Sequence, residues 1–111
     1  MNKTLFHLHA EICKTLASAK RLEILNILRD KEMAAGEIVK RMGIPKANVS
    51  QHLTLMRNAG ILDARRDGVC MYYRSSNPKV IKACDLMREV LVERHTQMEQ
   101  VFKKQKSNVH I

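Results

Sequence analysis

One segment of the chain, KANVSQHLTLMRNAGIL at residues 46–62, combines hydrogen-bonding side chains with a helical spacing. At about 100° per residue, a helix in this segment brings Val49, Leu53 and Met56 to one side, with His52 half-buried beside them. The opposite side and its shoulders carry mostly uncharged groups, namely Ala47, Asn48, Ser50, Gln51, Thr54, Arg57 and Asn58. Gln and Asn can bond an adenine edge in two places, Ser and Thr can donate or accept once, and Ala can contact a thymine methyl group. A solvated helix side usually carries Glu and Lys, so this side is predicted to read base edges.

The basic residues are concentrated in the middle of the chain. The formal net charge is +9, and the stretch from Lys40 to Lys82 contains nine basic but only two acidic residues. Lys46 begins the polar helix, and Arg65 and Arg66 follow it, where they could contact a phosphate or enter a minor groove. This distribution predicts double-stranded DNA as the partner. A membrane-surface helix would need bulky apolar residues opposite its basic ones, so no membrane partner is expected.

The residues around the polar helix predict a helix-turn-helix at 34–59. Residues 34–42 have helical spacing and end at Gly43, and Pro45 prevents the helix from continuing. The polar helix, predicted over 46–58, follows directly. Two helices joined by a short turn that contains glycine have the spacing of this DNA-binding motif.

The next segment, ILDARRDGVCMYYR at 61–74, predicts a β-hairpin that would form a wing beside the second helix. Asp67-Gly68 is the strongest two-residue signal for a hairpin turn. Tyr72 and Tyr73 are expected to pack within the strands, because base-stacking platforms present several spaced aromatic residues on one sheet.

Further helices are predicted at both ends of the chain. Thr4 is expected to cap a helix over residues 4–17, and Ser18 begins a largely apolar helix that should be central and buried. Asn77 is expected to cap a long last helix over residues 77–104. Apolar residues of this helix recur at alternating steps of four and three, at Val80, Cys84, Met87, Leu91, Met98 and Val101, with Arg94 in the one gap. Such a repeat predicts pairing, either with the first helix of the same chain or with the helices of a second subunit.

Length and composition limit the fold class. The 111 residues suit a single domain, predicted as residues 1–106 with a polar tail at 107–111. Aromatic residues make up only 4% of the chain, so the core is expected to be aliphatic and helical. The predicted fold is mainly α with a small β-hairpin, a winged helix-turn-helix in the order α-α-α-α-β-β-α. The chain has no apolar run near the roughly 20 residues that cross a bilayer and no signal peptide, so a cytoplasmic protein is expected.

Over essentially its whole length, the chain resembles the ArsR/SmtB family of winged-helix repressors. The stretches that carry the resemblance are LASAKRLEILNIL, GEIVKRMGIPKANVSQHLTLMRNAGIL and RRDGVCMYYR, and the second is the most specific. The resemblance implies a homodimer whose first and last helices form the interface. It also implies paired recognition helices that read an inverted-repeat operator, with half-sites about one DNA turn apart, and release on an inducing signal.

Few residues of this chain match the metal ligands known in that family. Residues 32–37, EMAAGE, contain no thiol where one site has cysteines, and residues 46–60 contain no cysteine where another has one. The four ligand positions of a third site correspond to Asn77, Lys79, Val90 and Glu93. Because Lys79 and Val90 cannot bind Zn²⁺ as required, no cofactor is predicted, although a metal or metalloid ion stays an alternative.

Three cysteines are the other candidates for sensing a signal. Cys13 on the first helix and Cys84 on the last would both lie at the expected dimer interface, where they could form a disulfide or polysulfide link or bind As(III). The alternative is that both are small core residues, as free cysteines often are, and the same holds for Cys70 in the wing. A thiol signal is favoured over a metal signal that would use Cys13, Cys70 or Cys84. A weaker candidate metal site near the C-terminus consists of His95, Glu99 and His110.

Two other classes of protein explain less of the sequence. A nonspecific architectural DNA-binding protein would account for the charge but not for the uncharged polar side of the 46–58 helix. The ratio of specific to nonspecific affinity separates these two classes. An enzyme with a cysteine nucleophile would need a histidine within reach of the thiol in a concave site. No such arrangement can be inferred from the sequence, so no enzyme is expected.

Overall fold

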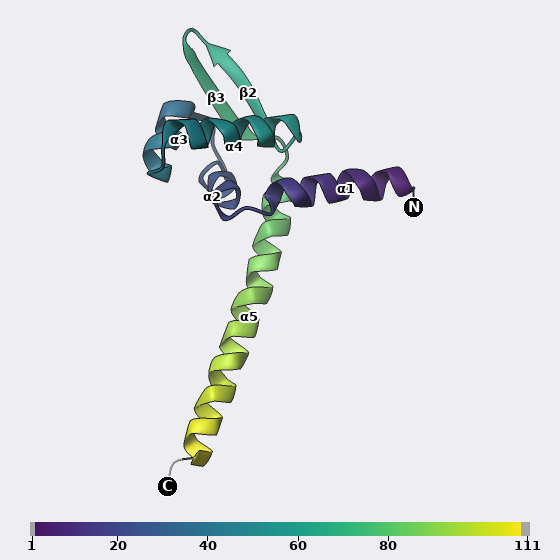
Figure 1. Ribbon diagram of the computed structural model, residues 1–111, viewed down its shortest axis with the longest axis vertical. Helices are drawn as coiled ribbons and strands as arrows, with labels where there is room; N and C mark the ends of the chain where they lie inside the picture. Colours follow the sequence, from purple (N-terminus) through teal and green to yellow (C-terminus); the bar gives the residue numbers. More distant parts are fainter. Residues whose placement is uncertain (1, 110–111) are drawn as a thin grey trace. The chain divides into compact units, whose positions relative to one another are not determined.

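The computed structural model describes the backbone of residues 2–109 and the side chains of residues 2–104 (Figure 1). Its elements are α1 (Lys3–Leu16), α2 (Ala19–Ile27), β1 (Met33–Ala34), α3 (Ala35–Met42), α4 (Lys46–Asn58), β2 (Leu62–Asp67), β3 (Cys70–Ser75) and α5 (Pro78–Val109). They form two compact units, Met1–Ile81 and Lys82–Ile111, and the second consists of the greater part of α5. The predicted fold class, mainly helical with a small antiparallel sheet, is confirmed.

Capping residues explain where the helices begin and end. Ser18 caps α2 as predicted, because its hydroxyl oxygen accepts a hydrogen bond from the Arg21 N–H at 3.3 Å. The prediction that Thr4 caps α1 was wrong: Asn2 is the cap, and its side-chain oxygen accepts a hydrogen bond from the Thr4 N–H at 2.8 Å. Asn is as good a cap as Thr, so the earlier residue begins the helix. Gly43 ends α3 in the left-handed conformation, at a φ of 64°.

The first and last residues of α5 can be compared with the predictions. Asn77 caps α5 as expected, since its side-chain oxygen accepts a hydrogen bond from the Lys79 N–H at 2.9 Å. The helix continues to Val109, beyond the predicted end near residue 104. The predicted tail at 107–111 therefore begins inside the helix, and residues 110 and 111 lie outside the described residues. Between residues 2 and 109, no helix combines the length and the apolar character that crossing a bilayer requires.

The sheet contains a strand that the sequence did not predict. β1 pairs with β3, and the strand order is β1-β3-β2, so β3 is central. The predicted turn was also one residue early. Asp67 pairs with Cys70, so the loop residues are Gly68 and Val69. Gly68 has a φ of 63°, and a positive φ at the first loop residue is the pattern of a type II′ turn.

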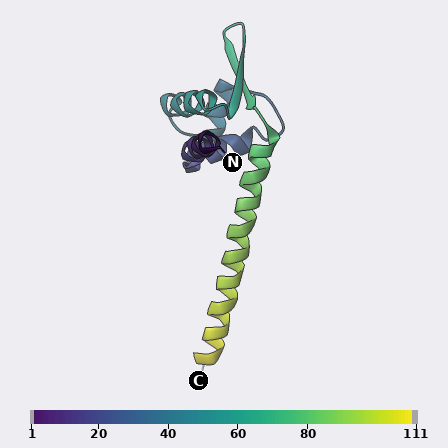
Figure 2. The same ribbon diagram turned by 90° about the vertical axis from the view of Figure 1, so that its right-hand side faces the viewer.

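The first unit is built around one aliphatic core. Its most buried side chains come from α2, β1, α3, α4, β2 and the residues beside them, namely Ile24, Leu25, Leu28, Met33, Ile38, Val49, Leu53, Met56, Ile61 and Leu62. The hydroxyl of Ser76 donates to the carbonyl oxygens of Gly60 and Ile61 at 2.6 and 2.9 Å, which joins the two ends of the hairpin. The tip of this hairpin projects away from α3 and α4 in both views (Figure 1, Figure 2).

Candidate nucleic-acid interface

The two sides of α4 differ in the way that its sequence predicts. Val49 and Met56 are fully buried and Leu53 is 2% exposed, so this side holds the helix against the core. The residues predicted to read or contact DNA are all exposed, namely Lys46, Ala47, Asn48, Ser50, Gln51, Thr54 and Arg57, as is Asn58. The helix therefore presents its uncharged polar side to solvent while the opposite side is packed.

The hydrogen-bonding capacity of this polar side is largely unused. Within the described residues, the side chains of Asn48, Ser50 and Gln51 make no hydrogen bond. Thr54 is different, because its hydroxyl donates to the backbone carbonyl of Ser50 at 2.9 Å. Thr54 can accept a hydrogen bond from a base while keeping this one, but it can donate to a base only by giving it up.

Two features of α4 were not predicted. Leu55 is 51% exposed and lines a shallow depression with Ser50, Gln51 and Thr54. The available signal was its position four residues after Gln51, which places it on the same outward side. The first turn of α4 also has no side-chain cap, since Pro45 precedes it. Its N–H groups, beside Lys46, form a positive helix terminus that is suited to phosphate.

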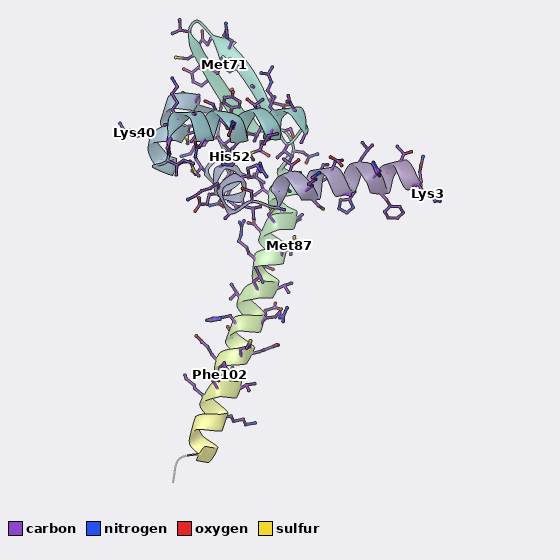
Figure 3. The ribbon with its side chains drawn as sticks, viewed as in Figure 1. Lys3, Lys40, His52, Met71, Met87 and Phe102 are labelled. Carbon is purple, nitrogen blue, oxygen red and sulfur yellow. The ribbon has the colours of Figure 1, made fainter. Side chains whose placement is uncertain are left out.

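His52 lies on α4 at the edge of the packed side and is half-buried, as expected (Figure 3). Its Nδ1 atom is buried and has no hydrogen-bond partner among the described residues. His52 therefore does not belong to the exposed polar side of α4.

Arg65 is engaged within the protein. Its Nε and Nη2 atoms donate to the two carboxylate oxygens of Glu32 at 2.7 and 2.6 Å. Its guanidinium carbon lies 4.6 Å from the centre of the Tyr72 ring, and its Nη1 atom lies 4.0 Å from an Asp67 oxygen. These hydrogen bonds hold the pKa of Glu32 below its usual value and raise the pKa of Arg65. Sequence reasoning missed Glu32, because it lies 33 residues from Arg65 and no local pattern joins the two.

Arg66 is placed differently from its neighbour. Alternate residues of a strand point to opposite faces of the sheet, so Arg66 shares the face of Leu62 and Arg65 the other. Leu62 is buried, and β2 contacts α4. Arg66 is exposed and makes no ion pair or hydrogen bond within the part of the chain that is described. The two predicted wing cations are thus not equivalent.

The face that carries Arg65 also carries carboxylates. Asp63 and Asp67 alternate with Arg65 along β2, and Asp63 lies 3.7 Å from Arg74 on the paired strand. With Glu32, this face holds three acidic side chains around two arginines. The face that carries Arg66 has no acidic residue in β2 or β3.

The three cysteines have different environments. Cys13 on α1 and Cys70 on β3 are exposed, whereas Cys84 on α5 is buried. Over the described residues, no three side chains from His, Cys, Asp and Glu are grouped so that they could hold a metal ion. His95 and Glu99 lie 3.2 Å apart on α5, and His110 lies outside the described residues.

Two helices, α3 and α4, joined by a short turn and followed by the β2–β3 hairpin define a winged helix-turn-helix. A family model described as "Bacterial regulatory protein, arsR family" matches residues 18–64. Together with the relatives described next, this match shows that the chain belongs to the ArsR family, whose members are transcriptional regulators rather than enzymes.

The relatives share both sequence and fold with this chain. The uncharacterized HTH-type transcriptional regulator Rv0081 of Mycobacterium tuberculosis is 36% identical over 91 residues, which are 81% of this chain and 80% of that protein. Its crystal structure gives a TM-score of 0.75 over 85% of this chain and 95% of the other. The NMR structure of the homodimeric winged helix-turn-helix DNA-binding domain of Mb0332 from Mycobacterium bovis, a possible ArsR-family transcriptional regulator, is 31% identical. It gives a TM-score of 0.74 over 82% of this chain and 84% of that one. The transcriptional repressor PagR of Bacillus anthracis is 34% identical in its crystal structure. That structure gives a TM-score of 0.69 over 78% of this chain and 99% of the other.

Proposed function

We propose that the protein is a homodimeric transcriptional repressor that binds an inverted-repeat DNA operator in a sequence-specific manner. The observation that carries this proposal is the exposed polar side of α4, opposite a side that is fully packed. Asn48, Ser50 and Gln51 have unused donors and acceptors, and such groups suit the base edges of a major groove. Ala47 and Leu55 add apolar atoms that suit thymine methyl groups.

The phosphates would be contacted by the groups around this polar side. Lys46 and the uncapped first turn of α4 lie at one end of the helix, and Arg57 lies in its last turn. Arg66 on the wing is an exposed cation without an internal partner in the described chain. Such contacts set affinity and position, while the base contacts set the sequence preference.

The dimer is supported by apolar side chains that a single chain leaves exposed. On α1, Leu5, Phe6 and Leu8 are each more than half exposed, and the helix has no buried residue. On α5, the exposed apolar side chains are Leu86, Met87, Val90, Leu91, Val92, Met98, Val101 and Phe102. So many exposed apolar side chains on two helices usually mark a protein–protein interface. The related domain of Mb0332 is homodimeric, which agrees with a dimer of this chain.

Selection of preferred sequences from random DNA, followed by titration, tests the proposal. The specific site should bind about 10³-fold or more tightly than random DNA at physiological salt, with one dimer on each inverted repeat. A ratio near one would instead indicate a nonspecific architectural protein. A reporter gene behind the selected site should be expressed less when the protein is present, and activation of the reporter would contradict repression.

We further propose that the inducing signal acts on a thiol. Cys13 is exposed on α1, one of the two proposed dimer helices, so an oxidant or a sulfur donor can reach it. Oxidation there, alone or in a link with Cys84, would alter the geometry of the dimer and hence its fit to two half-sites.

The matched control for this thiol is Cys70, which is also exposed but lies in the wing. Oxidant or polysulfide should weaken operator binding by the wild type and by Cys70→Ser, and Cys13→Ser should resist. As(III) and divalent metals form further arms of the same titration. A Cys13→Ser variant that responds as the wild type does would eliminate this thiol as the sensor.

A further inference from the structure

We propose that Glu32 and Arg65 form a positioning pair that holds the wing in place relative to α3 and α4, leaving Arg66 as the wing arginine that meets a phosphate. This inference rests on the proposed DNA-binding function, and it assigns different roles to two adjacent arginines. It also gives a role to an acidic residue outside the DNA-facing surface.

The geometry of Arg65 leaves little of its guanidinium for another anion. Two of its nitrogen atoms bond the two oxygens of Glu32, and its guanidinium carbon lies over the Tyr72 ring, 4.6 Å from the ring centre. An arginine that bonds both oxygens of one carboxylate with two of its nitrogen atoms forms the strongest and most directional kind of arginine–carboxylate ion pair. A phosphate would have to displace Glu32 and would then approach Asp67.

The pair crosses the whole sheet. Arg65 is on β2, Tyr72 is on the central strand β3, and Glu32 immediately precedes β1. Arg65 therefore reaches over β3 to the far edge. Only two residues of β1 pair with β3, so the hydrogen-bonded connection at this edge is short. The Glu32–Arg65 contact adds a second connection at the same edge.

That edge is the one that leads into the helix-turn-helix. β1 ends at Ala34 and α3 begins at Ala35 without an intervening loop. Because α3 packs on α4, a wing fixed to β1 is also fixed relative to the polar side of α4. A mobile wing would lose conformational entropy on binding DNA, and a fixed wing has already lost it.

The test measures DNA affinity as a function of salt concentration for the wild type, four variants and one control variant. Each cation that contacts a phosphate contributes about 0.9 to the slope of log K against log salt. Arg66→Ala should reduce the slope by about that amount per wing. Glu32→Gln and Arg65→Gln should each weaken binding about two- to fivefold per wing, the range for an exposed ion pair, with little change in slope. The exchanged pair Glu32→Arg with Arg65→Glu should recover much of the lost affinity.

Glu37→Gln is the matched control, because Glu37 forms an exposed ion pair with Arg41 inside α3 at 3.3 Å and makes no hydrogen bond or ion pair with the wing in the described part of the chain. Its affinity and slope should equal those of the wild type. If Glu32→Gln binds DNA more tightly and with a steeper slope, Glu32 merely withholds Arg65 from a phosphate, and the proposal is overturned. Unchanged binding by Glu32→Gln overturns it as well.

A measurement without DNA separates this inference from the proposed function. In the free protein, hydrogen exchange of the amides in β2 and β3 should be faster in Glu32→Gln and Arg65→Gln than in the wild type, and unchanged in Arg66→Ala. Exchange that stays at the wild-type rate in both variants would show that the pair does not hold the wing. If the wild type showed no sequence-specific binding, the proposed function would be refuted, but the hydrogen-exchange result would still stand.

Discussion

Replacement of Gln51 by alanine should weaken binding to the operator and leave the fold intact. Gln51 is exposed in the middle of the polar side of α4, and its amide makes no hydrogen bond within the described residues. Removing it therefore breaks no internal contact. Alanine is also a slightly better helix former than glutamine, so the free energy of unfolding should change by less than about 0.5 kcal/mol.

The expected loss in binding follows from the contact that Gln51 would make. A bidentate pair between an amide and an adenine edge contributes about 1–3 kcal/mol of discrimination. That corresponds to about 5- to 150-fold in affinity for each half-site at 25 °C. Because a dimer would lose the contact twice, the total should be about 2–6 kcal/mol on the full inverted repeat. On random DNA, where Gln51 has no fixed partner, the loss should be close to zero.

Fluorescence anisotropy with labelled operator and random duplexes at one salt concentration measures both quantities. Gln97→Ala is the matched control, since it removes the same atoms from an exposed position on α5. Thermal unfolding of the three proteins establishes that their folds are equally stable. Equal losses on operator and random DNA would refute the base-reading role of Gln51. A Tm lowered by more than about 5 °C would show that the residue is structural.

Three further outcomes test the packing and electrostatics of the same unit. Leu53→Ala should lower the free energy of unfolding by about 2–5 kcal/mol in a urea titration, because Leu53 is 2% exposed. Gly43→Ala should cost about 1–2 kcal/mol in the same assay, because Gly43 has a φ of 64°, whereas Gly36→Ala, at an ordinary helical φ, should be neutral or stabilising. The pKa of Glu32 lies below its ordinary value of 4.5, so its ion pair with Arg65 stabilises the fold above pH 4.5 and loses this effect as the pH falls through the lowered value. The Tm difference between wild type and Glu32→Gln should therefore shrink in acid, and a difference that persisted would contradict the ion pair.

The helix-turn-helix could be predicted because its signals are local. Pro45 and Gly60 bound α4 in the sequence, and the spacing of Val49, Leu53 and Met56 identifies its packed side without reference to any other element. The same holds for the exposed polar side, since it follows from the buried one by geometry. The sequence did not predict which hydrogen bonds the polar side chains make, including the one that the Thr54 hydroxyl donates to the Ser50 carbonyl.

The features that could not be predicted depend on contacts between distant residues. β1 has only two residues, which is too short for any alternation, and it exists because β3 pairs with it. The position of the hairpin turn depends on the register in which β2 and β3 pair. In this register Asp67 pairs with Cys70, so the turn is formed by Gly68-Val69 and not by the more common pair Asp67-Gly68. Arg65 looked like any exposed cation near a turn, because its partner Glu32 precedes the whole helix-turn-helix in the chain.

The central strand of the sheet is the last of its three strands to be synthesised. Since the strand order is β1-β3-β2, neither β1 nor β2 has a hydrogen-bonding partner until Cys70–Ser75 are present. On the ribosome, α2, α3 and α4 emerge earlier and can begin to pack against one another before either strand can pair. The helices would therefore assemble first, and the wing would close late. A chain broken off before residue 70 would contain α1 to α4 but would expose two unpaired strands, β1 and β2, and unpaired strand edges are where chains associate and aggregate.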